Sequence, residues 1–189
     1  MRKAIILILL LVLAVWGYFT LGLSAYQTYS SKAAPPAVEF KYPKSWTIKI
    51  DIGKIEKYSQ IFISGPRNKA DTYDAMFVVR ETPAGERFNS IHELMDHKMA
   101  HMYANARVLQ KSDYWLDKNP GQTAELTYVI PPSGFNGLKP IPIDVRTKIV
   151  FVQTGKKLYE ISYSADQADF SKFQRDFDYL LKSFRFNPA

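Results

Sequence analysis

Residues 145–184 read VRTKIVFVQTGKKLYEISYSADQADFSKFQRDFDYLLKSF and contain two strand patterns followed by a helix pattern. Residues 145–153 and 158–165 have the apolar and β-branched side chains that favour strands. Between them stands Thr154-Gly155-Lys156-Lys157, whose length and glycine are typical of a tight hairpin turn. The sequence therefore predicts two neighbouring antiparallel strands in this region.

The helix predicted over residues 169–182 is amphipathic. Its apolar side chains fall on one narrow arc at 3.6 residues per turn. They are Phe170, Phe173, Phe177, Leu180, Leu181 and Phe184. A stripe with this many aromatic side chains predicts a helix that docks firmly against a sheet.

The rest of the chain has further strand patterns and one more helix. Residues 46–52 alternate between apolar and polar side chains, which predicts a strand with one buried face. Residues 58–64, 75–80, 108–115 and 122–130 also have strand patterns. Ser90 and Glu93 form a capping-box pattern before an apolar helical stripe of Ile91, Leu94, Met95, Met99 and Met102. Because no alternating βαβ pattern is present, we expect an α+β sandwich of consecutive antiparallel strands with two inserted helices, preceded by an N-terminal hydrophobic helix.

The N-terminus has an apolar segment, residues 4–25, behind Arg2 and Lys3. Its length is close to the roughly 20 residues that cross a bilayer. Residues 1–25 are therefore a signal anchor or a cleaved signal peptide, and Leu23 fits poorly with cleavage after Ala25. We favour a single-pass membrane anchor, with residues 26–37 as a tether and residues 38–189 as a domain on the extracytoplasmic side. If the segment is cleaved, the domain is periplasmic.

Composition limits what the domain can be. The chain has 189 residues, of which 47% are hydrophobic, which suits one packed domain. It has no cysteine, so neither a disulfide nor a lipid-modified cysteine is possible. The net charge of +7 fits a well-solvated surface. Because the basic run between Lys41 and Lys57 largely alternates like a strand, we expect no nucleic-acid partner.

Two short motifs resemble a known superfamily. Phe40-Lys41-Tyr42-Pro43-Lys44-Ser45-Trp46 near the start, and Ser183-Phe184-Arg185-Phe186 after Phe177 and Leu180-Leu181 at the end, look like the PsbP/Mog1/DcrB superfamily. The resemblance covers residues 38–187. It implies an antiparallel sheet with helices on both faces, and roles as accessory, assembly or binding proteins rather than enzymes.

Glu93, His97 and His101 are spaced i, i+4 and i+8, so they lie on one face of the first helix. We expect this face to point away from the apolar stripe, toward solvent. The three side chains are a candidate zinc or copper site, with water or another loop completing the ligand shell. The alternative is a polar outer face that happens to carry histidines.

Residues 131–144 form a long connection between two predicted strands, and such loops often have a function. The segment has four prolines and the apolar side chains Phe135, Leu138, Ile141 and Ile143. Exposed, these four side chains would contact a protein partner or the membrane. Buried, they would make the segment a lid over the sheet edge or a helix end.

Patterns for catalysis are few. The sequence has no cysteine nucleophile, no G-x-S-x-G motif and no glycine-rich phosphate loop. We therefore expect a membrane-tethered, extracytoplasmic accessory or binding module that docks to another envelope component, with no cofactor and no enzyme activity. One alternative is a cleaved periplasmic or secreted protein that binds a metal or a small apolar ligand. The other is a hydrolase with an unrecognised site.

Overall fold

The structure, a computed structural model, describes residues 25–31, 36–52, 58–69, 71, 74–103, 105–131 and 142–186. Most of the apolar N-terminal segment lies outside these residues, as do Phe135, Leu138 and Ile141. None of the helices in the described residues is long and apolar enough to cross a membrane.

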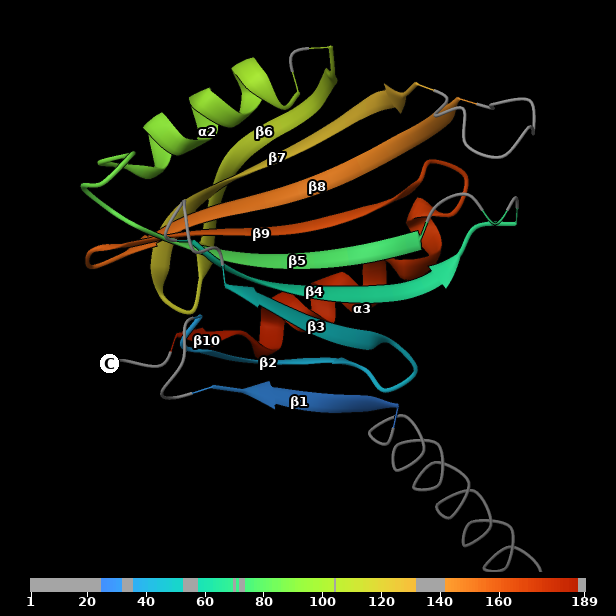
Figure 1. Cartoon of the computed structure of the whole chain (residues 1–189), viewed down its shortest axis with the longest axis horizontal. Helices are drawn as coiled ribbons and strands as arrows, with labels where there is room; N and C mark the ends of the chain where they lie inside the picture. The colour runs from blue at the N-terminus through green and yellow to red at the C-terminus, as the bar shows by residue number, and fades with distance from the viewer. Residues whose placement is uncertain are drawn as a thin grey trace, which may run out of the picture.

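The larger sheet is antiparallel and has seven strands in the order β3-β4-β5-β9-β8-β7-β6 (Figure 1). Each strand from β3 to β5 and from β6 to β9 pairs with the next one along the chain, and β9 joins the two groups by pairing with β5. The strands are β3 Thr47–Ile52, β4 Ser59–Arg67, β5 Asp74–Pro83, β6 Arg107–Leu116, β7 Asn119–Ile130, β8 Ile143–Thr154 and β9 Lys157–Asp166.

A second, three-stranded sheet has the order β1-β2-β10, with β1 Tyr26–Ser30, β2 Val38–Pro43 and β10 Arg185–Phe186. This corrects the predicted tether, because Tyr26–Ser30 is a strand paired with β2. The hydroxyl of Tyr26 also donates to Asp176 Oδ1 at 2.5 Å, and its ring packs on Tyr179. The strand β1 is at the edge of its sheet and has no fully buried residue, so it lacks the apolar pattern by which a strand is recognised in a sequence.

The helices α2, Ile91–His101, and α3, Phe170–Ser183, pack on opposite faces of the large sheet (Figure 1). Alternate residues of β8 show this arrangement. Val150 and Val152 join the core beneath α3, whereas Ile149 and Phe151 join the core beneath α2. The predicted α+β fold, with an antiparallel sheet between helices, is confirmed for the described residues.

The core beneath α3 holds most of the aromatic side chains. Phe177 is fully buried, with its ring centroid 5.4 Å from that of Phe77. Phe184, which caps the end of α3, stacks on Phe40 of the small sheet, and this contact joins that sheet to the helix. The predicted apolar stripe of α3 is confirmed, although Phe173 is only half-buried.

Turns and edges show where local patterns succeed and fail. The hairpin between β8 and β9 is confirmed, with Thr154 paired to Lys157 and Gly155 at φ +55°. The predicted buried face of residues 46–52 is confirmed for Trp46, which is buried, and is wrong for Ile50 and Ile52, which are 49% and 59% exposed. Their strand, β3, is the outermost one of its sheet, and only its Ile48 packs against the core.

Candidate functional site

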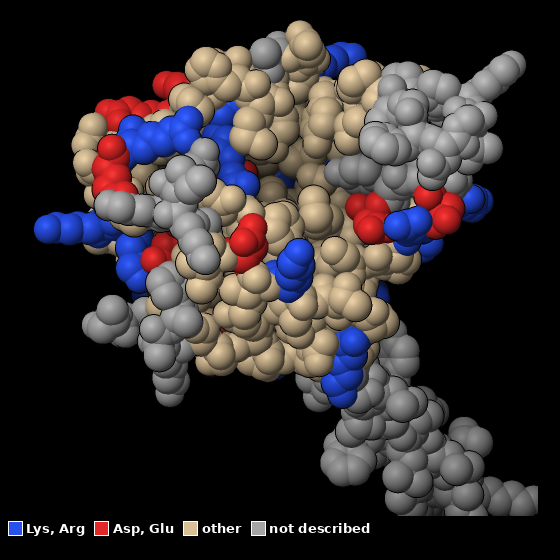
Figure 2. Space-filling model, viewed as in Figure 1, with Lys and Arg blue, Asp and Glu red and all other residues tan. Residues whose placement is uncertain are grey.

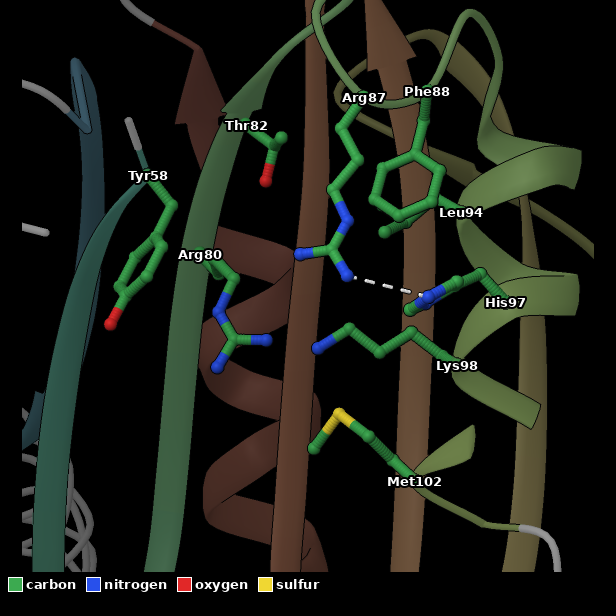
Figure 3. Close-up of a pocket in the computed structure, with 9 residues that line it drawn as sticks. All are labelled: Tyr58, Arg80, Thr82, Arg87, Phe88, Leu94, His97, Lys98 and Met102. Carbon is green, nitrogen blue, oxygen red and sulfur yellow. Dashed lines mark hydrogen bonds between the residues drawn. The ribbon is translucent and has the colours of Figure 1, made fainter. Parts of the chain in front are cut away.

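A cavity of about 280 Å³ lies between α2 and the adjoining strands (Figure 3). Its lining combines basic and apolar side chains from β5, α2 and the segments beside them. The lining residues are Tyr58, Arg80, Thr82, Arg87, Phe88, Leu94, His97, Lys98 and Met102. None of the residues in this described lining is acidic.

The alternation of strands and the period of α2 explain why these side chains meet. On β5, Val79 faces the core beneath α3, so the next residue, Arg80, faces α2. On α2, Leu94 and Lys98 are one turn apart and both are buried. A lysine on the buried face of a helix needs an ionic partner, and β9 supplies one.

That partner is Glu160, a buried carboxylate on the α2 face of β9. Its Oε2 lies 2.9 Å from Lys98 Nζ and 3.2 Å from Arg80 Nη1. Arg80 also donates from Nε and Nη2 to Gln60 Oε1 at 3.2 and 2.9 Å. Burial lowers the pKa of Lys98, while the charge of Glu160 opposes that effect. One carboxylate is thus shared by two cations at the base of the cavity.

His97 faces this cavity, which corrects the prediction that its side chain points to solvent, whereas Glu93 and His101 on the same helical face are exposed as predicted. Its ring lies 5.1 Å from that of Phe88, and Arg87 Nη2 lies 3.4 Å from its Nε2. Because a guanidinium only donates, the neutral ring accepts at Nε2 and carries its proton on Nδ1. The buried Nδ1 has no hydrogen-bond partner in the part of the chain that the structure describes. The pKa of His97 is lowered, first by burial and then by the charges of His101, Arg87 and Lys98.

Glu93 and His101 relate differently to His97. Glu93 Oε2 accepts from the backbone N–H of Asn89 at 2.7 Å, so its carboxylate lies at the start of α2. Ser90 accepts from Glu93 N, which confirms the predicted N-cap. His101 is closer, with its ring 4.5 Å from that of His97. Across the described ranges, no group of three His, Asp or Glu side chains is placed to hold a metal, and the zinc or copper site stays a prediction.

The loop prediction falls mostly outside the described residues. Only Ile143 can be placed: it begins β8, is half-buried and pairs with Ile130. Its role in partner binding stays a prediction, as do those of Phe135, Leu138 and Ile141.

The strands β6 and β7, at the outer edge of the large sheet, carry several exposed apolar side chains. We call them the β6–β7 edge; they are Val108, Leu109, Trp115 and Val129, with exposed fractions of 45%, 43%, 69% and 56%. Val129 pairs with Asp144 at the base of the loop. Trp115 borders a second cavity, of about 560 Å³, between β6, β7 and the start of α2.

Sequence reasoning missed the cluster of Arg80, Lys98 and Glu160. A usable signal was present in β9, where Glu160 is a charge within a strand that is buried along almost all its length. A buried charge must be paired, so the presence of Glu160 in this strand predicts a cation on a facing element. The sequence does not say which of its 25 Lys and Arg residues that cation is.

The fold is of the PsbP/Mog1/DcrB-like type, which confirms the resemblance of the two motifs. No protein-family model and no curated protein matches the chain. The similar solved structures include cyanobacterial PsbP (CyanoP) from Synechocystis, at 15% identity and a TM-score of 0.55, covering 86% of this chain and 92% of that one. They also include PA94, a protein of unknown function from Pseudomonas aeruginosa, at 10% identity and a TM-score of 0.54, covering 87% and 99%. Another is LpqN of Mycobacterium tuberculosis, at 11% identity and a TM-score of 0.52, covering 86% and 92%. At these identities the likeness concerns the fold alone.

Proposed function

We propose that this chain is a membrane-tethered, extracytoplasmic and non-catalytic binding module that docks to another protein of the cell envelope. The apolar segment of residues 4–25 behind Arg2 and Lys3 supports the tether and the orientation. One of the similar structures, LpqN, is described as involved in cell envelope biogenesis. The absence of sequence motifs for nucleophilic or phosphoryl chemistry supports a binding role.

The observation that carries the docking proposal is the β6–β7 edge. Trp115, Leu109 and Val129 present apolar surface that a soluble domain normally covers. Tryptophan in particular is enriched among the residues that dominate binding energies at protein interfaces. The strand β6 is also the outermost strand of its sheet in the described chain, so one row of its backbone groups is directed outward.

The proposed contact extends from this edge onto residues 131–144. Val129 and Asp144 hold the two ends of that segment together across β7 and β8. Phe135 and Leu138 are the proposed anchors within it, because prolines stand on both sides of them and reduce the entropy lost on binding. Leu109 and Val129 lie at the end of the edge nearer this segment, whereas Trp115 lies beside the β6–β7 turn at the other end, so a partner of the whole edge would extend along β6.

Site-specific crosslinking in intact membranes tests this proposal. A photoreactive amino acid is placed at Leu109 or Trp115 of the full chain, with Ser171 on the exposed side of α3 as the control position. We expect a discrete protein adduct from the two edge positions and none from Ser171. The proposal fails if the edge positions give no adduct, or the same products as Ser171.

Substitution then separates docking from folding. Trp115→Ala removes a side chain that is 69% exposed, so the melting temperature should hardly change while the adduct from Leu109 is lost. The double variant Phe135→Ser and Leu138→Ser tests the loop in the same way. If either variant folds normally and keeps the adduct at its wild-type level, the altered residues are not part of the contact.

A further inference from the structure

We propose that the cavity beside Trp115 binds an uncharged saccharide, with the indole as a stacking surface and Asp113 and Gln122 as hydrogen-bonding groups. The cavity has a volume of about 560 Å³ and lies between the start of α2 and the strands β6 and β7. Saccharide binding goes beyond the proposed docking to a protein. The two proposals share Trp115, but Leu109 and Val129 of the β6–β7 edge do not belong to the described lining of this cavity.

The pleat of the sheet brings the polar groups and the indole together. On β6, Tyr114 packs against the core beneath α3, so Asp113 and Trp115 on either side of it point to the face on which α2 lies. Gln122 of β7 pairs with Asp113. In the same register, Pro120 pairs with Trp115. Side chains of directly paired residues lie on the same face of a sheet, so these four form one patch, and the first turn of α2 forms the facing wall.

The hydrogen-bonding groups of this cavity are not consumed by the fold. Neither Asp113 nor Gln122 makes a side-chain hydrogen bond or ion pair within the described part of the chain. The carboxylate of Asp113 only accepts hydrogen bonds, whereas the amides of Gln122 and Gln153 both donate and accept them. Sugar hydroxyls also donate and accept, so they satisfy both kinds of group. A metal ion, by contrast, would leave the amide donors without partners.

The charge of the lining also favours an uncharged ligand. A neighbouring cavity of about 320 Å³ shares Asp113 and Gln122 with the first and adds Lys111, two residues from Asp113 on the same face of β6. With histidine counted as neutral, the combined described lining has one negative and one positive side chain. On the face drawn in Figure 2, acidic and basic side chains are interspersed, and no large area is of one sign. The field that would select an ion over a neutral molecule is therefore weak.

Trp115 supplies the apolar part of the site. It is 69% exposed and borders the cavity, so a flat apolar face is open to a ligand. A sugar ring has C–H groups on its faces and hydroxyls around its rim, so stacking on an indole buries the first and leaves the second for the polar groups. The volume lies within the range of roughly 300–1,000 Å³ for ligand sites. Because the neighbouring cavity shares Asp113 and Gln122, a short oligosaccharide fits better than a single ring.

Calorimetric titration of the full chain in nanodiscs of phosphatidylcholine tests the site, with maltotriose, cellotriose and chitotriose as probes. These trisaccharides are uncharged and differ in linkage and in the N-acetyl groups of chitotriose, so their comparison identifies the class of sugar. We expect saturable binding of at least one of them. Trp115→Ala should weaken this binding by about tenfold or more, because the stacking surface is lost. Gln122→Ala should weaken it about fivefold, as expected for one hydrogen bond between neutral groups.

The matched control is Gln110→Ala, because Gln110 is the same residue type, is exposed on β6 and lines neither of the two cavities. It should leave the affinity unchanged. Asp113→Asn alters an exposed side chain without changing its shape and should also weaken binding, so it decides the matter if Gln122→Ala melts well below the wild type. The proposal is overturned if no probe binds, if Trp115→Ala binds as tightly as the wild type, or if both polar variants do.

The saccharide and docking proposals fail independently. Docking is measured by the crosslink from Leu109, whereas saccharide binding is measured on the purified chain with no partner present. Gln122→Ala and Asp113→Asn should weaken saccharide binding and leave the Leu109 adduct at its wild-type level. Saccharide binding without an adduct would contradict docking alone, and an adduct without saccharide binding would contradict the saccharide site alone.

Discussion

Replacing Phe177 by alanine would remove a fully buried ring from the core beneath α3. The ring centroid lies 5.4 Å from that of Phe77 and 5.6 Å from that of Tyr163, so both neighbours lose a packing partner. A buried Phe→Ala change costs about 3–5 kcal/mol, through lost burial and the cavity left behind. For a domain of this size, that corresponds to a fall in melting temperature of about 6–20 °C.

Calorimetry or circular dichroism of the purified full chain measures this loss, with Phe173→Ala as the control. Phe173 is the same residue type on the same helix, but it is half-buried and contacts Trp46 at the edge of the core. We expect Phe173→Ala to lose about half as much stability as Phe177→Ala. The half-buried ring of Phe173 has less apolar area shielded from water, so its removal costs less burial energy. Equal losses for the two variants, or a Phe177→Ala protein that melts within two or so degrees of wild type, would refute the packing described here.

Three further predictions concern the cavity and α2. Lys98→Met should destabilise the domain by about 3–5 kcal/mol, since Glu160 loses one of its two cations, and adding Glu160→Gln should restore part of the loss in denaturant unfolding. The lowered pKa of His97 means that the unfolded chain binds more protons than the folded one near this pH, so stability is lost as pH falls through the ordinary value of 6.5. The melting temperature of His97→Gln should therefore change less between pH 7.5 and 5.5 than that of the wild type. If the metal prediction holds, zinc binding measured by calorimetry should disappear in His101→Asn, and zinc binding that survives there would contradict a site built on His97 and His101.

The elements that the sequence predicted well are those determined by neighbours along the chain. The apolar stripe of α3 follows from residue spacing alone. The hairpin between β8 and β9 is marked by Gly155, because the left-handed conformation of this turn residue favours glycine. The hairpin between β6 and β7 carries no such mark. Its turn residues Asp117 and Lys118 have φ values of 46° and 68°, and Asn119 Nδ2 donates to the carbonyl of Asp117. A side-chain hydrogen bond stabilises this turn in place of glycine.

Burial depends on which strands end up at the edge of a sheet, and that is decided by contacts far apart in the chain. Ile50 and Ile52 alternate as residues of a half-buried strand do, yet in the described part of the chain β3 is the outermost strand of its sheet and both side chains are exposed. The cavity was missed for a related reason. Arg80 and Glu160 come from β5 and β9, which are neighbours in space and 80 residues apart in sequence. Residue spacing within one helix, which produced the metal prediction, holds no information of this kind.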